Sequence, residues 1–109
     1  MREQDYVNRF TYSGKLGSEP KTVEINGASK TTISLAQNKT NGRGVRRVLW
    51  ARFEYWREDA KKVQELNLKK GDDVLVVDAE YDKREYTKDG TKQYWECFNG
   101  GVVSLVEAN

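Results

Sequence analysis

The chain has 109 residues, of which 37% are hydrophobic and 33% charged, and its formal net charge is +2. This length fits one domain with one modest core, and the composition is too apolar for an intrinsically disordered chain. No apolar run approaches the ~20 residues of a membrane-spanning helix, and the single cysteine, Cys97, excludes an intrachain disulfide. We therefore expect one cytoplasmic domain, residues 1–109, with no membrane partner.

The first forty residues predict short strands with tight turns between them. The predicted elements are a strand over residues 7–13, a turn over 14–20, an extended piece over 22–25, a hairpin turn at Asn26-Gly27 and a strand over 30–36. Asn-Gly is a favoured two-residue hairpin turn because both residues tolerate a positive φ. The polar and basic residues 38–44 indicate a loop.

A long strand is predicted over residues 45–56, and its alternation separates two faces. One face carries Trp50, Arg52, Glu54 and Trp56, and the other carries Ala51, Phe53 and Tyr55.

The second half of the chain predicts one short amphipathic helix, two further strands and a closing segment. The helix is expected over residues 58–66, where Ala60, Val63 and Leu66 recur at helical spacing. The other elements are strands over 74–81 and 93–98, with a hairpin turn over 88–91, and residues 102–106 close the chain. The residues expected in the core are Phe53, Tyr55, Leu75, Val77 and Tyr81. The order of three strands, a helix and two strands predicts an all-β, five-stranded OB-fold barrel with a short helix between strands three and four.

The residue types that carry most enzyme chemistry are missing or isolated. The chain has no histidine, the commonest general base and metal ligand. Cys97 lies inside a predicted strand with no histidine to activate it, and one cysteine cannot form a Cys-rich zinc site. The carboxylates are scattered among lysines, and no Gly-rich phosphate-binding motif occurs. We expect no enzyme activity, no metal and no cofactor.

Positive charge is concentrated in one segment of the chain. Between Gln37 and Phe53 there is no acidic residue, and the cations there are Lys39, Arg43, Arg46, Arg47 and Arg52. Such a concentration is typical of a groove that follows a nucleic-acid backbone. A solvated loop that carries charge for solubility is the alternative.

Aromatic side chains are interleaved with these arginines. Trp50 and Trp56 lie six residues apart on one predicted strand face, with Arg52 between them. Trp rings on an outward face fit stacking on nucleic-acid bases, which tolerates any base sequence, and arginine can bind phosphate or stack on a base. The alternative is that both Trp residues lie in the core or in a subunit interface.

Several short motifs occur in a defined order between residues 7 and 106. They are Val7-Asn8-Arg9-Phe10, the turn Gly14-Lys15-Leu16-Gly17-Ser18-Glu19-Pro20, Ile33-Ser34-Leu35-Ala36, then Trp50, Trp56 and Ala60, then Leu68-Lys69-Lys70-Gly71, and Tyr86 with Lys88-Asp89-Gly90. In this order and spacing, the set resembles the bacterial-type single-stranded DNA-binding protein family, SSB.

The resemblance implies an OB barrel that coats single-stranded DNA during replication, recombination and repair. It also implies a homo-oligomer, with a tetramer favoured and a dimer possible. Carried over to this chain, the base-stacking residues are Trp50, Trp56 and Tyr86. The first expected phosphate contacts are Arg52 and Arg84, because they share predicted faces with these aromatics. The next are Arg46, Arg47 and Lys39. Trp95 is expected to pack or to lie in an interface.

The chain departs from the family pattern in three places. Thr40 and Asn41 lie where the family usually has an aromatic residue, and the loop before Trp50 is shorter than in many members, which predicts a smaller DNA site. One extra residue between Gly71 and Tyr86 leaves the register of residues 72–75 open. The sequence ends at Asn109 without the family's acidic, Phe-ending tip, so recruitment of repair proteins through such a tip is not expected.

Two other interpretations fit the same fold class, because OB folds host many functions. A PriB-like primosomal accessory protein would act as a dimer and mainly contact other proteins, and a different OB module would bind RNA or mediate assembly. Four acidic residues also crowd the predicted DNA-binding strand, which is unfavourable beside phosphates; they are Asp78, Glu80, Asp82 and Glu85.

Overall fold

The computed structural model describes residues 6–106, which form seven strands and one short helix. In chain order the elements are β1 (Phe10–Leu16), β2 (Lys21–Ile25), β3 (Ala28–Thr40), β4 (Arg46–Trp56), α1 (Glu58–Glu65), β5 (Asp73–Lys88), β6 (Thr91–Asn99) and β7 (Val102–Leu105). In this part of the chain no helix is long and apolar enough to cross a membrane.

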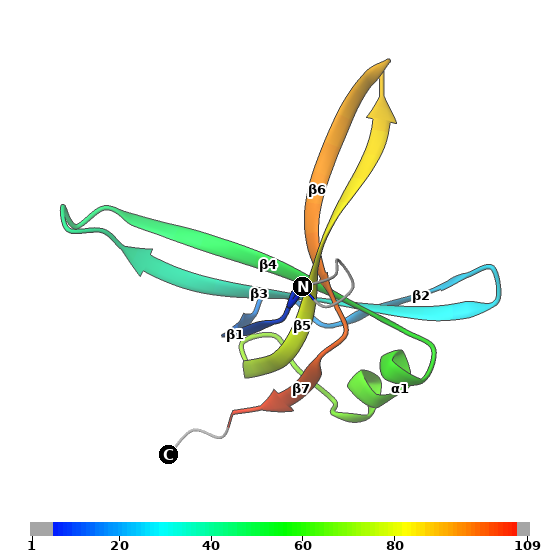
Figure 1. The fold of residues 1–109 in the computed structure, drawn as a ribbon. Coiled ribbons are helices and arrows are strands. Elements are labelled where there is room, and N and C mark those ends of the chain that lie inside the picture. Colours follow the sequence, from blue (N-terminus) through cyan, green and yellow to red (C-terminus); the bar gives the residue numbers. More distant parts are fainter. Residues whose placement is uncertain (1–5, 107–109) are drawn as a thin grey trace.

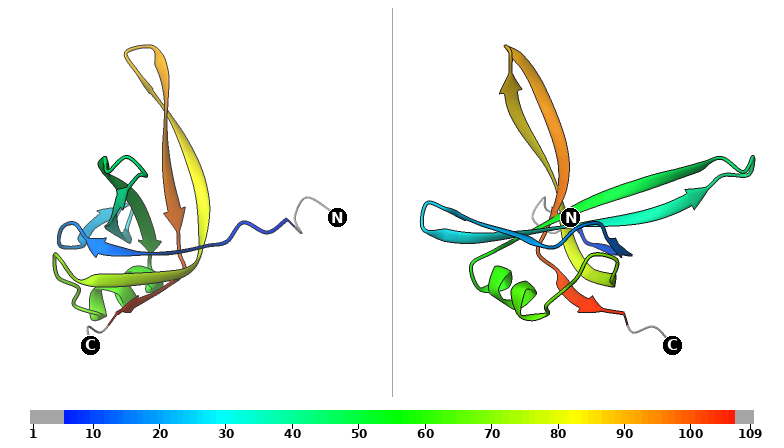
Figure 2. Two further views of the ribbon diagram at one scale, coloured as in Figure 1. Left: turned by 90° about the vertical axis from the view of Figure 1, so that its left-hand side faces the viewer. Right: turned by 180° about the vertical axis from the view of Figure 1, so that it is seen from behind.

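Three long hairpins project from the region where the strands cross (Figure 1, Figure 2). They are the β2–β3, β3–β4 and β5–β6 hairpins, which we call the three arms. The Cα radius of gyration is 15.7 Å, whereas a compact chain of this length is expected near ~13 Å. The arms therefore carry much of the polypeptide away from the core.

The turns at the arm tips explain where the arms end. Asn26-Gly27 and Asp89-Gly90 each have two successive positive φ angles, as a two-residue hairpin turn requires, so both predicted turns are confirmed. The loop predicted over residues 38–44 is wrong in its extent, because β3 continues to Thr40 and β4 begins at Arg46. Both faces of this arm are solvated, so polar residues can pair there as strands.

Five strands pair into a ring that defines the fold. β1 pairs with β3, β3 with β4, β4 with β6, β6 with β5, and β5 again with β1. The ring is uneven, since β4 and β6 are joined by only two parallel residue pairs, Phe53 with Phe98 and Glu54 with Asn99. The result is a mostly β, OB-like sheet in which the one helix follows the third ring strand, as predicted, although the ring is less regular than the expected barrel.

The core fills the inside of this ring. The apolar face predicted for β4 is confirmed, because Ala51, Phe53 and Tyr55 are buried. The remaining buried members of the cluster are Leu16, Ile33, Leu35, Ala60, Val63, Leu68, Val74, Val76 and Ala79. Phe53 stacks on Phe98 with ring centroids 5.1 Å apart. Helix α1 contributes Ala60 and Val63, so its apolar face covers the end of the core below the arms (Figure 1).

A β-bulge in β5 corrects two predicted core residues. Phe10 pairs with Ala79 and Tyr12 with Val76, so one residue of β1 lies opposite two residues of β5, the second being Asp78 with φ 63°. Before the bulge the even-numbered residues Val74 and Val76 point inward, and after it Ala79 does. The prediction of Leu75 and Val77 as core is therefore wrong, because both lie on the other face and are only half-buried. Tyr81 is half-buried at the rim.

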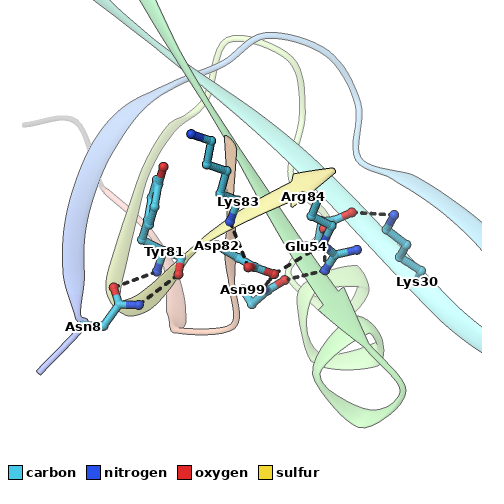
Figure 3. Close-up of polar contacts among 8 residues, drawn as sticks. All are labelled: Asn8, Lys30, Glu54, Tyr81, Asp82, Lys83, Arg84 and Asn99. Carbon is cyan, nitrogen blue, oxygen red and sulfur yellow. Dashed lines mark hydrogen bonds and ion pairs between the residues drawn. The ribbon is translucent and has the colours of Figure 1, made fainter. Parts of the chain in front are cut away.

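The polar side chain of Asn8 fixes β5 just beyond this bulge (Figure 3). Its amide nitrogen donates to the Tyr81 carbonyl at 2.9 Å, and its amide oxygen accepts from the Tyr81 N–H at 3.2 Å. Beyond the bulge the odd-numbered residues of β5 point inward and the even-numbered ones outward. This alternation continues into the β5–β6 arm and places Arg84 and Tyr86 on the outward side.

Candidate nucleic-acid interface

The outward side of the ring is one continuous surface across four strands, which we call the outer face. Directly paired residues of adjacent strands lie on the same side of a sheet, so the register identifies its members. They include Lys30, Thr32 and Ser34 of β3, Trp50, Arg52, Glu54 and Trp56 of β4, Glu80, Asp82, Arg84 and Tyr86 of β5, and Trp95, Cys97 and Asn99 of β6. The outward face predicted for β4 thus contains the residues that were expected on it.

Trp50 is the most exposed tryptophan of the outer face, with 62% of its surface accessible. The edge of its indole lies against the backbone of Gly17, where a Cβ in place of the glycine hydrogen would come within 2.4 Å of the ring. The N–H of Gly17 donates to the carbonyl of Ser34 at 3.0 Å, which fixes this backbone next to β3. Gly17 therefore leaves room for the ring while the rest of the indole stays open to solvent.

Trp95 and Tyr86 form a second exposed aromatic group on the β5–β6 arm. Their ring centroids are 5.4 Å apart, and their exposed fractions are 40% and 42%. The guanidinium of Arg52 lies 5.2 Å from the Trp95 ring centroid, which is within the range of a cation–π contact. Trp95 was expected to pack or to lie in an interface. In this chain it contacts two predicted site residues, Tyr86 and Arg52.

Trp56 is less accessible than Trp50 at the other end of β4. It is half-buried, and the Lys30 Nζ lies 5.6 Å from its ring centroid. The structure therefore places all three predicted stacking residues, Trp50, Trp56 and Tyr86, on one surface but exposes them unequally.

Glu54 lies at the centre of the outer face and is buried under cations (Figure 3). Its carboxylate forms ion pairs with Lys30 and, at 3.2 Å, with Nη2 of Arg84. Arg84 also contacts Oδ2 of Asp82 through Nε at 3.4 Å and donates to Oδ1 of Asn99 at 3.3 Å. The Asn99 amide in turn donates to Asp82 at 3.3 Å. We call these five residues the ionic cluster.

The ionic cluster determines the charge state of its members. Burial alone would raise the pKa of Glu54, but the hydrogen bond and charge of Lys30 and the charge of Arg84 outweigh it and hold the pKa below its ordinary value. Cys97 lies beside this carboxylate, and burial, followed by the hydrogen bond and charge of Glu54, raises the pKa of its thiol. Glu54 is thus ionised and Cys97 is a protonated thiol at neutral pH.

Two of the four acidic residues that crowd β5 are paired with cations, one of them inside the ionic cluster. Asp82 is compensated by Arg84, and the hydrogen bond from the Lys83 backbone N–H is the main reason that its pKa is lowered. Glu85 lies on the opposite side of the arm and pairs with Lys92 at 3.3 Å. Arg84, an expected phosphate contact, is therefore held between two carboxylates and is only about one-third exposed.

The basic residues of the β3–β4 arm divide between its two sides. Arg46 pairs with Thr40 and Trp50 pairs with Ala36, and the register between these two pairs is unbroken. Arg46 therefore lies on the same side of the arm as Trp50. Lys39 and Arg47 pair directly with each other on the opposite side. The structure thus brings Arg46 and Arg52 together with the aromatics, and separates Lys39 and Arg47 from them.

Two features of the outer face were missed by sequence reasoning. Gly17 was interpreted only as part of a turn, although its contact with Trp50 requires two segments more than thirty residues apart. Glu54 was placed on the correct face, but its burial depends on Lys30 and Arg84, which belong to different strands. No local sequence pattern marks either contact, because each exists only after the strands pair.

Comparison with known proteins shows the family and the fold of the chain. The family described as "Single-strand binding protein family" matches residues 7–96. The chain belongs to the single-strand binding protein family. Its fold is similar to that of a solved structure described as "Plasmodium falciparum SSB complex with ssDNA", with a TM-score of 0.82 and 21% sequence identity over 98% of this chain and 100% of that chain. No curated protein sequence matches the chain.

Proposed function

We propose that this chain binds single-stranded DNA without sequence preference, through the aromatic residues and cations of the outer face. The observation that carries the proposal is the exposure of Trp50, 62% of whose surface is open on the sheet of a single-strand binding family member. The related Plasmodium falciparum structure is a complex with single-stranded DNA, which supports the same ligand class here.

Base stacking is the proposed source of affinity. Each base stacked on an aromatic side chain contributes about 1–3 kcal/mol, whatever the base. Trp50, Trp95 and Tyr86 have open ring surface for this contact, and Trp56 has less. Exposed rings grouped on one face are otherwise unfavourable in water, which is why such patches mark binding surfaces.

Phosphate contacts are proposed for the cations that share this side. Arg52 and Arg46 lie beside the aromatics and are the first candidates. Arg47 and Lys39 would contact phosphates of a DNA strand that continues around the β3–β4 arm. Arg84 is proposed to act at the edge of the site, since its guanidinium is already paired with Glu54 and Asp82.

The wider role follows the family and is part of the proposal. The chain would cover single strands exposed in replication, recombination or repair, and would do so by binding alone, without chemical turnover. A homo-oligomer, with a tetramer favoured over a dimer, stays a prediction that light scattering of the purified chain checks.

The test is a titration of labelled oligo-dT at two salt concentrations, read by fluorescence anisotropy. We expect tight binding that weakens with salt, because bound phosphates release counterions, and a clear loss of affinity for Trp50→Ala and Trp95→Ala. Tyr94→Ala is the matched control, since Tyr94 is 55% exposed on the other side of the same arm, next to Lys83.

Three outcomes would contradict the proposal. Absence of binding at low salt would remove the function itself. An equal loss for Tyr94→Ala and Trp95→Ala would remove the assignment of the outer face. A clear preference for RNA in competition with DNA of equal length would favour the RNA-binding alternative.

A further inference from the structure

The outer face has a groove that is lined by Arg52. None of the other residues proposed to contact phosphate lines it. Its volume is about 310 Å³, and it lies between the β2–β3 arm and β4. The polar residues that line it are Ser18, Lys21, Lys30, Thr32, Ser34 and Arg52. They come from four segments of the chain: the turn after β1, and strands β2, β3 and β4.

The chemistry of this groove fits a phosphate. It combines three cationic side chains with three hydroxyl groups, and no carboxylate of the described residues 6–106 lines it. Hydroxyl and ammonium or guanidinium groups are the side-chain donors that hold phosphate oxygens in nucleic-acid complexes. Within the same described range the only apolar lining residue is Val23.

Glu54 organises the groove from beneath without lining it. Its buried carboxylate holds Lys30 in an ion pair, and an ammonium group has three N–H donors, so donors of Lys30 stay available for a second acceptor. The pair is neutral as a whole. Lys21 and Arg52 therefore supply the net positive charge of the groove.

The position of the groove connects the two tryptophans of β4. Ser34 pairs with Arg52, which lies between the pairs Ala36–Trp50 and Lys30–Trp56. Six residues of an extended strand span about 20 Å. A DNA strand with bases on both Trp50 and Trp56 can therefore carry its backbone across this groove.

We infer that this groove binds a backbone phosphate of the DNA strand between its contacts with Trp50 and Trp56, with Lys21 as the principal new ligand. The inference rests on the proposed function and extends the site from β4 onto the β2–β3 arm. Lys21 becomes a phosphate contact although it lies outside the basic segment of residues 37–53.

The experiment measures the salt dependence of oligo-dT affinity for the wild-type chain, Lys21→Ala and Lys61→Ala. Lys61 is an exposed lysine on α1 that lines a different depression, so its loss changes the net charge equally without touching the groove. An oligonucleotide of about 16 residues covers the upper range of OB-fold site sizes. The slope of log K against log salt falls by about 0.7 for each single-strand phosphate contact that is lost.

We expect Lys21→Ala to bind more weakly and to lower that slope by about 0.7, and Lys21→Glu to bind more weakly still, whereas Lys61→Ala keeps the wild-type slope. Equal slopes for Lys21→Ala and Lys61→Ala would overturn the inference while leaving the proposed function intact. Absence of wild-type binding would instead remove the proposed function and the inference with it. Far-UV circular dichroism of each variant confirms that the exposed substitutions leave the fold unchanged.

Discussion

Trp50 and Glu54 lie four residues apart on the same side of β4, yet they have opposite environments. Trp50 is 62% exposed, whereas Glu54 is only 1% exposed. Hydrophobicity alone would predict the reverse. The difference shows that strand alternation assigns a residue to a face, and that contacts from distant strands decide whether this face is covered at that point.

The two environments have separate physical causes. Around Glu54, Lys30 from β3 and Arg84 from β5 converge on one carboxylate and shield it from water. Around Trp50, the neighbouring segment contributes Gly17, which has no side chain to cover the ring. The outer face thus has a closed ionic part, which holds strands together, and an open aromatic part, which is available to a ligand.

The largest expected effect comes from breaking the closed part with Glu54→Gln. Removing one partner of a buried ion pair typically costs 3–5 kcal/mol because the other charge is left unpaired. Arg84 is about one-third exposed and can still reach water, so we expect a loss near the lower end, about 3 kcal/mol in the free energy of unfolding. Urea denaturation followed by circular dichroism measures it.

The control for this change is Glu85→Gln, which breaks the exposed Glu85–Lys92 pair of the β5–β6 arm. Exposed pairs are worth about 0–1 kcal/mol, so this variant should unfold almost as the wild type does. Equal destabilisation by both substitutions would show that the ionic cluster has no special role.

Acidification gives the same prediction a second readout. The pKa of Glu54 is lowered by folding from an ordinary value of 4.5, so the unfolded chain binds more protons in that range and stability is lost as pH falls through the folded pKa. Glu54→Gln lacks this contribution. The difference in unfolding free energy between wild type and variant should therefore be full at neutral pH and shrink below about pH 4.5.

Much of the fold could be predicted from the sequence because its signals are local. The Asn26-Gly27 and Asp89-Gly90 turns follow from residue types that accept positive φ. The buried face of β4 follows from alternation of Phe53 and Tyr55 with polar residues. The helix begins at Glu58, as its apolar spacing predicted.

The errors in the predicted core arose where one extra residue in a strand changed which side chains point inward. The bulge at Asp78 reverses which residues of β5 face inward, so Leu75 and Val77 were assigned to the wrong side. An extra residue near this strand was detectable in the sequence, but its position was not, because a bulge is fixed by pairing with β1. The ionic cluster was unpredictable for the same reason, since Lys30, Glu54 and Arg84 meet only through tertiary structure.

A smaller effect is expected from closing the open part with Gly17→Ala. A Cβ at Gly17 would lie 2.4 Å from the edge of the Trp50 ring, and an exposed side chain gives way more easily than the backbone. We expect the ring to be displaced and the affinity for oligo-dT to fall toward that of Trp50→Ala. One stacked base is worth about 1–3 kcal/mol, which bounds the loss at roughly 5- to 150-fold.

The assignment of this loss to Trp50 is testable with a double variant. In the Trp50→Ala background, Gly17→Ala should cause little further loss, because the two changes act on one contact. Gly42→Ala is the control glycine, since its φ is not positive and no atom of the described residues lies within contact of a Cβ there. Additive losses in the double variant would mean that Gly17 acts independently of the ring.

The smallest expected effect separates the two sides of the β3–β4 arm. Arg46 and Arg47 are adjacent and both exposed, and they differ mainly in that Arg46 shares its side with Trp50 whereas Arg47 lies opposite Lys39 on the other side. Their replacement by Ala changes the net charge equally, so any difference in oligo-dT affinity reports position and not long-range attraction. If DNA follows the outer face, Arg46→Ala lowers the salt slope by about 0.7, the value for one phosphate contact, and Arg47→Ala lowers it less. A larger reduction of the slope for Arg47→Ala would place the DNA on the Lys39 side of the arm. The exposed aromatic surface around Trp50 would then contact something other than the bound DNA.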